Sequence, residues 1–289
     1  MIQKIKNNPH TIGILLVIVD SFFFSLMTLL VRMSGDIPTL QKTFFRNAVA
    51  AVVAVIVLSR SQEKFKMKKG SLPLLLARSF FGGVGMIANF WAIDHIGLAD
   101  SNILNKMSPF FAIIFSIFIL SEVPKLPDWI AVAIAFIGAI FVVKPTGSIA
   151  GTPALVGLLS GLGAGLAYTF VRKMGKMGER GPLIVAFFSV FTSLLCLPGM
   201  VMNYAPMSAK QWMLLLGAGC AAALGQFSVT AAYKFAPAKD ISVFDYSQVL
   251  FASIWGGIFF AELPDRWSIV GYVIIIGTAV VRWLRRDKE

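Results

Sequence analysis

Charged residues are scarce in this 289-residue chain, because Asp, Glu, Lys and Arg together make up only 14% of it. Soluble globular proteins contain about 25% charged and about 45–50% apolar residues, whereas 57% of this chain is hydrophobic. The few charges gather in short runs between long apolar segments. This composition excludes an ordinary soluble domain and indicates a polytopic membrane protein.

Histidine and cysteine are also rare, with two residues of each. The sequence contains no H-E-x-x-H zinc motif, no G-x-S-x-G nucleophile motif and no paired transmembrane aspartate motif of the kind found in membrane enzymes. A membrane enzyme is therefore the less favoured class, and we expect no catalytic residue and no cofactor. Cys196 and Cys220 both fall within apolar segments, from which we expect neither a disulfide nor a metal site.

Apolar segments long enough to cross a membrane recur along the whole chain. A helix needs about 20 apolar residues to cross about 30 Å of hydrocarbon, and lipid leaves the backbone no alternative to helix or closed barrel. The segments are residues 11–33, 40–58, 72–94, 101–121, 127–143, 152–172, 182–203, 211–233, 241–261 and 266–284. The sequence thus predicts an all-α membrane protein with ten transmembrane helices.

The net charge of +12 is distributed unevenly between the two faces of this predicted bundle. With ten spans both chain ends share one side, and that side carries most of the 26 Lys and Arg residues, including the runs "KFKMKK", "RKMGK" and "RWLRRDK". By the positive-inside rule this side is cytoplasmic. We therefore expect a multi-pass protein of the cytoplasmic (inner) membrane with both termini inside, and we interpret the basic charge as a topology signal and not as a nucleic-acid site.

The chain also repeats itself, since residues 74–143 align with residues 214–283 at a constant offset of 140. The informative matches are Gly85 with Gly225, Asp100 with Asp240, Glu122 with Glu262 and Pro124 with Pro264. We predict two five-span halves, residues 1–146 and 147–289. An odd number of spans inverts the second half, which is the architecture of many secondary transporters. The alternative is a duplication that only enlarged a membrane scaffold.

Three stretches of the sequence resemble the EamA family of the drug/metabolite transporter superfamily. They are "TLQKTFFRNAVAAVV" in the second span, "NFWAIDHIGLADSNILNKMSPFFAIIFSIFILSEVP" across the third and fourth, and its second-half partner "TAAYKFAPAKDISVFDYSQVLFASIWGGIFFAELP". The resemblance covers nearly the whole chain. It implies a solute carrier whose cavity is lined mainly by spans 1, 3, 4, 6, 8 and 9, with spans 5 and 10 peripheral. It does not define the substrate, and Lys106 and Asp245 depart from the generic family pattern.

Three basic residues, Arg46, Arg78 and Lys106, lie inside predicted spans. A charge at mid-membrane costs about 2.5–3.5 kcal/mol on insertion scales, so its default interpretation is functional. Counting about 1.5 Å per residue puts Arg78 and Asp245 together in the cytoplasmic third, where we expect them to pair. The same count puts Lys106 and Asp245 on opposite sides of the midplane, so we expect no pair there. For Lys106 and Arg46 the alternative is snorkelling to the outer interface.

The fourth span places Asn102, Asn105, Lys106 and Pro109 on one helical stripe. Pro109 has no backbone N–H, so it frees the Asn105 carbonyl and tends to kink the helix. That carbonyl either faces a cavity or is satisfied by neighbouring side chains. Asp20, near the centre of the first span, is either a proton-coupling carboxylate or a buried aspartate that caps a neighbouring serine.

Other polar and aromatic side chains are candidates for contact with a solute. They are Asn89 on the third span, Tyr168 on the sixth, and Tyr246, Gln248 and Trp255 on the ninth. For the aromatic residues, simple packing is the alternative. Gly157, Gly161 and Gly165 form a ridge of small residues that suits close helix contact.

These features favour a secondary transporter that works by alternating access. Its solute would be a small anionic or zwitterionic metabolite, because three buried cations outnumber Asp20 and Asp245 and can form charge-assisted hydrogen bonds to a carboxylate or phosphate. The resemblance points to export of an amino acid or related compound, with uptake or exchange of a nucleotide-like metabolite as the alternative. A passive channel or lipid-handling protein is the competing class. The expected partners are the solute and the lipid bilayer, and a homodimer is a further option.

Overall fold

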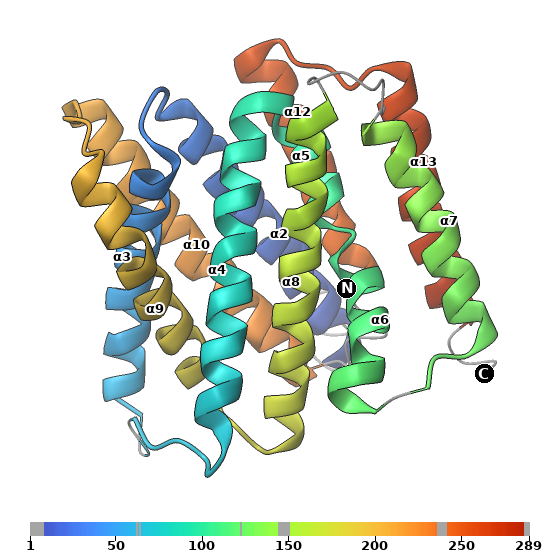
Figure 1. The fold of residues 1–289 in the computed structure, drawn as a ribbon, viewed down its shortest axis with the longest axis horizontal. Helices are drawn as coiled ribbons and strands as arrows, with labels where there is room; N and C mark the ends of the chain where they lie inside the picture. Colours follow the sequence, from blue (N-terminus) through green and yellow to red (C-terminus); the bar gives the residue numbers. More distant parts are fainter. Residues whose placement is uncertain are drawn as a thin grey trace.

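The computed structural model describes residues 9–285 apart from residues 62, 64, 122, 144–150 and 236–241. The described chain is a bundle of helices, and it contains no β-strand (Figure 1). The elements are α2 (Pro9–Met33), α3 (Thr39–Ser59), α4 (Ser71–Ile96), α5 (Leu98–Asn105), α6 (Ser108–Leu120), α7 (Leu126–Val143), α8 (Thr152–Lys176), α9 (Gly181–Met202), α10 (Ala209–Phe235), the 3₁₀ helix η2 (Ser242–Tyr246), α12 (Ser247–Phe260) and α13 (Arg266–Arg285).

Among the described residues, seven helical stretches are long and apolar enough to cross a membrane. They are Thr11–Met33, Thr39–Ser59, Ser71–Ile96, Leu98–Leu120, Thr152–Lys176, Gly181–Met202 and Ala209–Val229. The three other predicted segments also hold helix, in α7, in η2 with α12, and in α13, but their apolar stretches are shorter. The structure is therefore all-helical, as the sequence predicts, and fits a multi-pass membrane protein.

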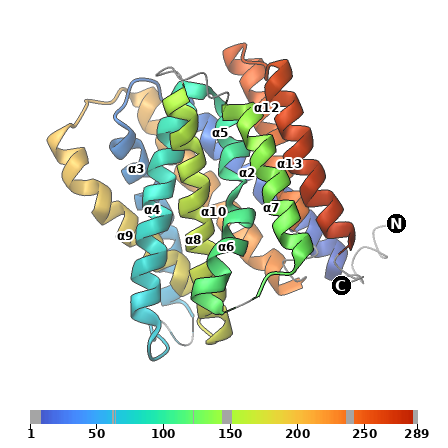
Figure 2. The same ribbon diagram turned by 45° about the vertical axis from the view of Figure 1, so that its right-hand side comes forward.

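The helices pack as a few extensive pairs. α4 packs on α8, α2 on α10, α3 on α9 and α7 on α13. In both views α3 and α9 lie at one end of the molecule and α7 with α13 at the other (Figures 1 and 2). Glycines allow the central pair to approach closely, because a Cβ on Gly163 of α8 would lie 2.8 Å from the Phe81 carbonyl oxygen of α4. Small residues at such contacts are typical of helices packed in membranes.

The predicted fourth span is broken and not merely kinked. α5 ends at Asn105 and α6 begins at Ser108, with Pro109 in its first turn. At the break the Met107 N–H donates to the Leu104 carbonyl at 3.1 Å, which is the tighter i−3 pattern of a 3₁₀ turn. The predicted ninth span has a similar irregularity, since η2 precedes α12.

The carbonyls at this break face a neighbouring helix. A Cβ on Gly161 of α8 would lie 2.5 Å from the Leu104 oxygen and 3.3 Å from the Asn105 oxygen. The Asn105 carbonyl therefore lies against a glycine of α8, and no described side chain donates a hydrogen bond to it. The glycine ridge of α8 thus fits against the irregular backbone.

Candidate functional site

An ion pair joins the two irregular helices inside the bundle. Lys106 Nζ lies 2.7 Å from Asp245 Oδ2, and the two side chains are 9% and 30% exposed. The expectation that these residues lie too far apart to pair was wrong. α5 begins at Leu98 and not near residue 101, which puts Lys106 about 4.5 Å further along the helix axis at 1.5 Å per residue, and its long stem adds further reach. The snorkelling alternative for Lys106 is also wrong.

Arg78 does not pair with Asp245, contrary to the sequence prediction. Its Nε and Nη1 atoms are buried and have no hydrogen-bond partner among the described residues. The guanidinium lies over the ring of Phe188 on α9, 3.6 Å from the ring centroid. The prediction compared depth only, and two residues at equal depth can still point to different neighbours around their helix axes.

Side chains flanking the ion pair connect α5 with η2 and α12. Tyr246 Oη donates to the Lys106 carbonyl at 3.0 Å, and Gln248 Nε2 donates to Asn102 Oδ1 at 2.7 Å. Asn105 Nδ2 donates to Ser160 Oγ of α8 at 3.1 Å. Four predicted site residues therefore meet around Lys106, where they hold the helices in register.

Asp20 lies close to this pair without bonding to it. The residue is 1% exposed, and its Oδ1 has no hydrogen-bond partner in the part of the chain that the structure describes. The charges of Asp245 and Lys106 act on it. Capping of the neighbouring serine was a wrong alternative, because Ser21 Oγ donates instead to the carbonyl and to Oδ1 of Asp245, at 3.2 and 3.4 Å.

Arg46 is buried on α3, with 4% exposure, and does not snorkel to an interface. Its Nη1 donates to Asn47 Oδ1 at 2.8 Å, and its Nε approaches Met27 Sδ at 3.2 Å. Arg46 also lines a small open pocket between α3, α9 and α10. The other lining residues are Ala50, Ala54, Val185, Phe188, Ser189, Ala222, Ala223, Gln226 and Phe227.

Tyr168 of α8 connects the two groups of charges. Its phenol interacts electrostatically with each of the five charged residues described above. The residue is also 55% exposed, so the chain itself leaves part of its surface uncovered. Tyr168 is the predicted site residue whose position best fits contact with a solute.

Two further predicted site residues take part in contacts between helices. Asn89 Nδ2 donates to Ser101 Oγ at 3.0 Å, which links α4 to α5. Trp255 Nε1 donates to Ser25 Oγ at 3.2 Å, which links α12 to α2. For Trp255 the packing alternative is supported, because its ring also meets Phe22 edge-on at 6.1 Å between centroids.

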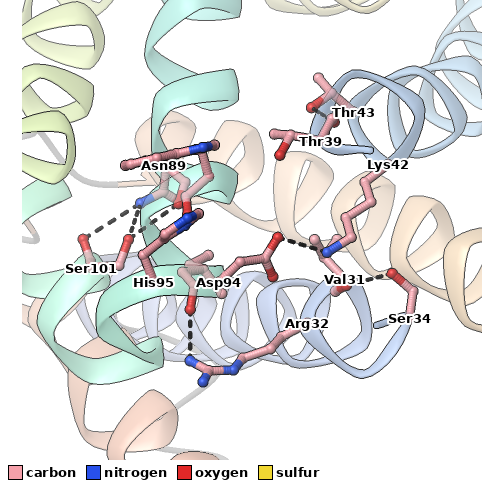
Figure 3. A network of polar contacts seen from close by, with 12 residues as sticks. Val31, Arg32, Ser34, Thr39, Lys42, Thr43, Asn89, Asp94, His95 and Ser101 are labelled. Atoms are coloured by element: carbon pink, nitrogen blue, oxygen red, sulfur yellow. Dashed lines mark hydrogen bonds and ion pairs between the residues drawn. The ribbon is translucent and has the colours of Figure 1, made fainter. Parts of the chain in front are cut away.

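A polar network at one end of the bundle was not predicted from the sequence (Figure 3). Lys42 Nζ lies 2.7 Å from Asp94 Oδ2 and joins α3 to α4. Arg32 of α2 pairs with Glu262, which follows α12, and also donates to the Ile93 carbonyl at 2.6 Å. Under the predicted topology this end faces outward. The available signal in the sequence was the presence of acidic residues, Asp94 and Glu262, close to the predicted outer ends of spans.

The opposite end has its own contacts. Arg180 Nε lies 3.0 Å from Glu63 Oε2, and the Lys68 N–H donates to Glu179 Oε2 at 2.8 Å. These contacts join the turn between α8 and α9 to the loop between α3 and α4. Among the described residues no cluster of His, Cys, Asp and Glu has the grouping of a metal site.

Comparison with known proteins finds one family over most of the chain. Residues 11–144 and residues 151–283 each match the EamA-like transporter family. The pseudopaline exporter CntI of Pseudomonas aeruginosa (strain UCBPP-PA14) is 34% identical over 281 residues, which cover 96% of this chain and 97% of that protein. Human solute carrier family 35 member G1 is 25% identical over 301 residues, covering 96% of this chain and 81% of that one. A crystal structure with 15% identity has the same fold, with a TM-score of 0.67 over 96% of this chain and 99% of its own.

Proposed function

The chain belongs to the EamA-like transporter family and is a multi-pass membrane transporter, and we propose that it exports a small zwitterionic or anionic metabolite by alternating access. The transport would run across the cytoplasmic membrane with both chain termini inside. Ten spans in two inverted halves, residues 1–146 and 147–289, would form the path. Two separate matches to one family, over residues 11–144 and 151–283, support the division into halves.

The observation that carries this proposal is the ion pair between Lys106 and Asp245. At the repeat offset of 140, Lys106 corresponds to Tyr246, and these two equivalent residues are also hydrogen-bonded to each other. Equivalent positions meet where a symmetry axis relating two halves passes between them. In transporters with inverted repeats, the solute site lies near the midplane at such an interface and is formed by broken helices.

The packing of the helices supports the same interpretation. Under the repeat, α4 on α8 corresponds to α10 on α2, and both are extensive contacts. α3 with α9 and α7 with α13 are pairs of equivalent helices, as expected for elements on the axis. Two halves that share one interface can rock about it, which would open the central site to each side in turn.

The charges of the site support the class of solute. Arg46, Arg78 and Lys106 outnumber Asp20 and Asp245, so the site has an excess positive charge when all five are ionised. A carboxylate would receive charge-assisted hydrogen bonds there. The name of the pseudopaline exporter, at 34% identity, supports export as the direction.

Transport by inside-out membrane vesicles tests the proposal and identifies the solute in the same experiment. Vesicles with the wild-type chain, vesicles with Asp245→Asn and vesicles without the protein would be energised in a small-molecule extract of the producing cells. Mass spectrometry of the washed vesicles would then identify what accumulates. We expect at least one zwitterionic or carboxylate metabolite in wild-type vesicles only, with Asp245→Asn accumulating far less.

Three results would contradict the proposal. Identical accumulated metabolites in vesicles with the wild-type chain and in vesicles without the protein would exclude export of a small metabolite. A solute without any ionised group, taken up equally by Asp245→Asn, would leave transport intact but remove the assigned site. Scrambling of fluorescent lipid by purified protein, with no solute uptake, would support the lipid-handling class.

A further inference from the structure

Arg78 is the one intramembrane cation whose donors are left open among the described residues. The residue is 7% exposed, and both Nε and Nη1 are buried without a hydrogen-bond partner. A buried charged donor without an acceptor is costly, and proteins usually pair or coordinate such charges. The guanidinium is held in place by the Phe188 ring beneath it, at 3.6 Å. Its free donors are thus held in position for an acceptor that the described chain does not supply.

A second guanidinium lies within electrostatic range. The charge of Arg78 acts on Arg46, and Arg46 lines the pocket between α3, α9 and α10. Phe188 belongs to the wall of that pocket and also carries Arg78 on its ring. The pocket has no acidic lining residue among those the structure describes. Two buried like charges beside a pocket without an acid repel each other, and a bound anion would relieve that repulsion.

We propose that Arg46 and Arg78 form a carboxylate subsite for the transported solute, distinct from the pair of Lys106 and Asp245. The assignment rests on the proposed transport function and adds which pole of the solute binds where. The planar guanidinium group suits a carboxylate, because two parallel N–H donors match its two oxygens. Lys106 is unsuited to the same task, since its ammonium is already bound to Asp245.

The remaining groups complete a dipolar site. Asp20 keeps Oδ1 without a described hydrogen-bond partner, beside Lys106 and Asp245, so this side of the site is the acidic pole. Tyr168 interacts with both poles, and the chain leaves part of its surface uncovered. A solute with a carboxylate at one end and a cationic group at the other would therefore span the site across Tyr168, with the carboxylate on Arg78.

Thiol modification by charged reagents tests the subsite directly, because the reagents themselves report the charge of the pocket. The reporter is Val185→Cys, because Val185 lines the pocket, is partly exposed and is close to cysteine in size. It would be built in a background with Cys196→Ala and Cys220→Ala. Reaction rates with an anionic (sulfonatoethyl) and a cationic (trimethylammonium-ethyl) methanethiosulfonate, each divided by its rate with a free thiol, give the charge preference of the pocket. The matched control is Val190→Cys, which is exposed on the same helix and outside the pocket.

We expect the anionic reagent to be preferred about tenfold at residue 185, as for one to two unit charges a few ångströms away in a partly hydrated site. Adding Arg78→Gln should lower this preference to about threefold, because the charge of Arg46 remains, whereas Arg78→Lys, which keeps the charge, should retain it. Glutarate should slow the anionic reagent at this position. Equal normalised rates at residue 185, or a preference that Arg78→Gln leaves unchanged, would overturn the subsite. Protection by inorganic phosphate and not by glutarate would overturn its assignment to a carboxylate.

This experiment and the vesicle experiment fail independently. An anion preference that depends on Arg78, together with vesicles that accumulate nothing, would retain the subsite and reject the export function. Export of a metabolite together with a pocket indifferent to charge would retain the function and reject the subsite.

Discussion

Lys106 and Asp245 form a buried ion pair, and in the proposed transporter the same two side chains belong to the solute site. A buried ion pair pays a desolvation cost that its attraction only partly returns, so it contributes little net stability. Removing one partner is far more harmful, because the other charge then stays buried alone. In the proposed transporter this asymmetry would be useful, because the cationic group of a solute would replace Lys106 beside Asp245 transiently. The pair would then be most stable either intact or with solute bound.

A double-mutant cycle tests this view of the pair. Lys106→Met should lower the free energy of unfolding by about 3 kcal/mol, at the lower end for a broken buried pair, because Asp245 is 30% exposed and keeps some hydration. Asp245→Asn should destabilise to a similar extent. The double variant should be less destabilised than the sum of the two, by about 1 kcal/mol or more. Denaturant unfolding of the protein in detergent, followed by tryptophan fluorescence, measures all three.

The matched control for this cycle is Lys125→Met, which removes a cation from the exposed turn before α7. It should change the free energy of unfolding by less than about 0.5 kcal/mol. Additive effects of Lys106→Met and Asp245→Asn would mean that the two side chains do not interact in solution.

At the residue scale, the sequence identified the charged groups but not their partners. Lys106, Asp245 and Arg78 stand out in apolar segments, because charge in lipid is costly whatever the fold. Pairing depends on two further quantities, where the helix starts and how it is rotated about its axis. An error of three residues in the start of α5 was enough to separate Lys106 from Asp245. The rotation of α4, which turns Arg78 toward Phe188, depends on tertiary packing that one amphipathic stripe does not reveal.

At the scale of elements, the glycine ridge of α8 packs against the interruption between α5 and α6. Gly161 lies against the Leu104 and Asn105 carbonyls, where any side chain would push the two helices apart. Broken helices at membrane depth are tolerated where their backbone is buried in protein. The glycine ridge supplies that burial and keeps Lys106 at the end of α5.

Two glycines of the same helix allow a matched test of this contact. Gly161→Ala should lower the free energy of unfolding by about 2 kcal/mol, the usual cost of overpacking, because its Cβ would lie 2.5 Å from a backbone oxygen. Gly175→Ala should be neutral or stabilising by about 0.5 kcal/mol, since nothing among the described residues lies within 4 Å of its Cβ. Thermal unfolding and vesicle transport of both variants provide the comparison. Equal behaviour of the two would show that the break does not need the glycine.

The ion pairs of Lys42 with Asp94 and Arg32 with Glu262 connect the ends of α2, α3, α4 and α12. If this end faces outward, they hold the outer side closed in the conformation described here. Asp94→Asn should then shift the equilibrium toward outward opening about fivefold, for a loss of about 1 kcal/mol. Spin labels attached at Tyr204→Cys and Leu263→Cys, in the background without native cysteines, would show this shift as additional, longer distances between the two labels.

The control for the outer ion pairs is Asp36→Asn, which removes the same charge from an exposed turn at the same end. Its distance distribution should match that of the unmodified protein. Longer distances in both variants would assign the effect to general loss of negative charge, and unchanged distances in both would mean that the ion pair does not hold the outer end closed.

For the whole molecule, the predictable part of the architecture is the part determined by lipid. Segment lengths and hydropathy located helix in every predicted segment, because a membrane forces backbone hydrogen bonds to be local. The number of membrane-spanning helices was harder to predict, since α7, α12 and α13 are shorter or less apolar than the seven clear spans. Their membrane position depends on packing against neighbours such as α7 on α13 and on how far each helix tilts, which hydropathy does not encode.

The orientation of the whole bundle is the remaining large-scale prediction. The basic loops place Phe65 on the cytoplasmic side and Tyr204 on the outer side, and both are exposed, at 53% and 48%. In the background without native cysteines, a membrane-impermeant maleimide added to intact cells should label Tyr204→Cys at once. It should reach Phe65→Cys only after the membrane is made permeable. Labelling of Phe65→Cys in intact cells would invert the bundle and exchange the faces assigned to the ion pairs of Arg32 and Arg180. With the bundle inverted, the subsite at Arg78 would lie nearer the outer surface.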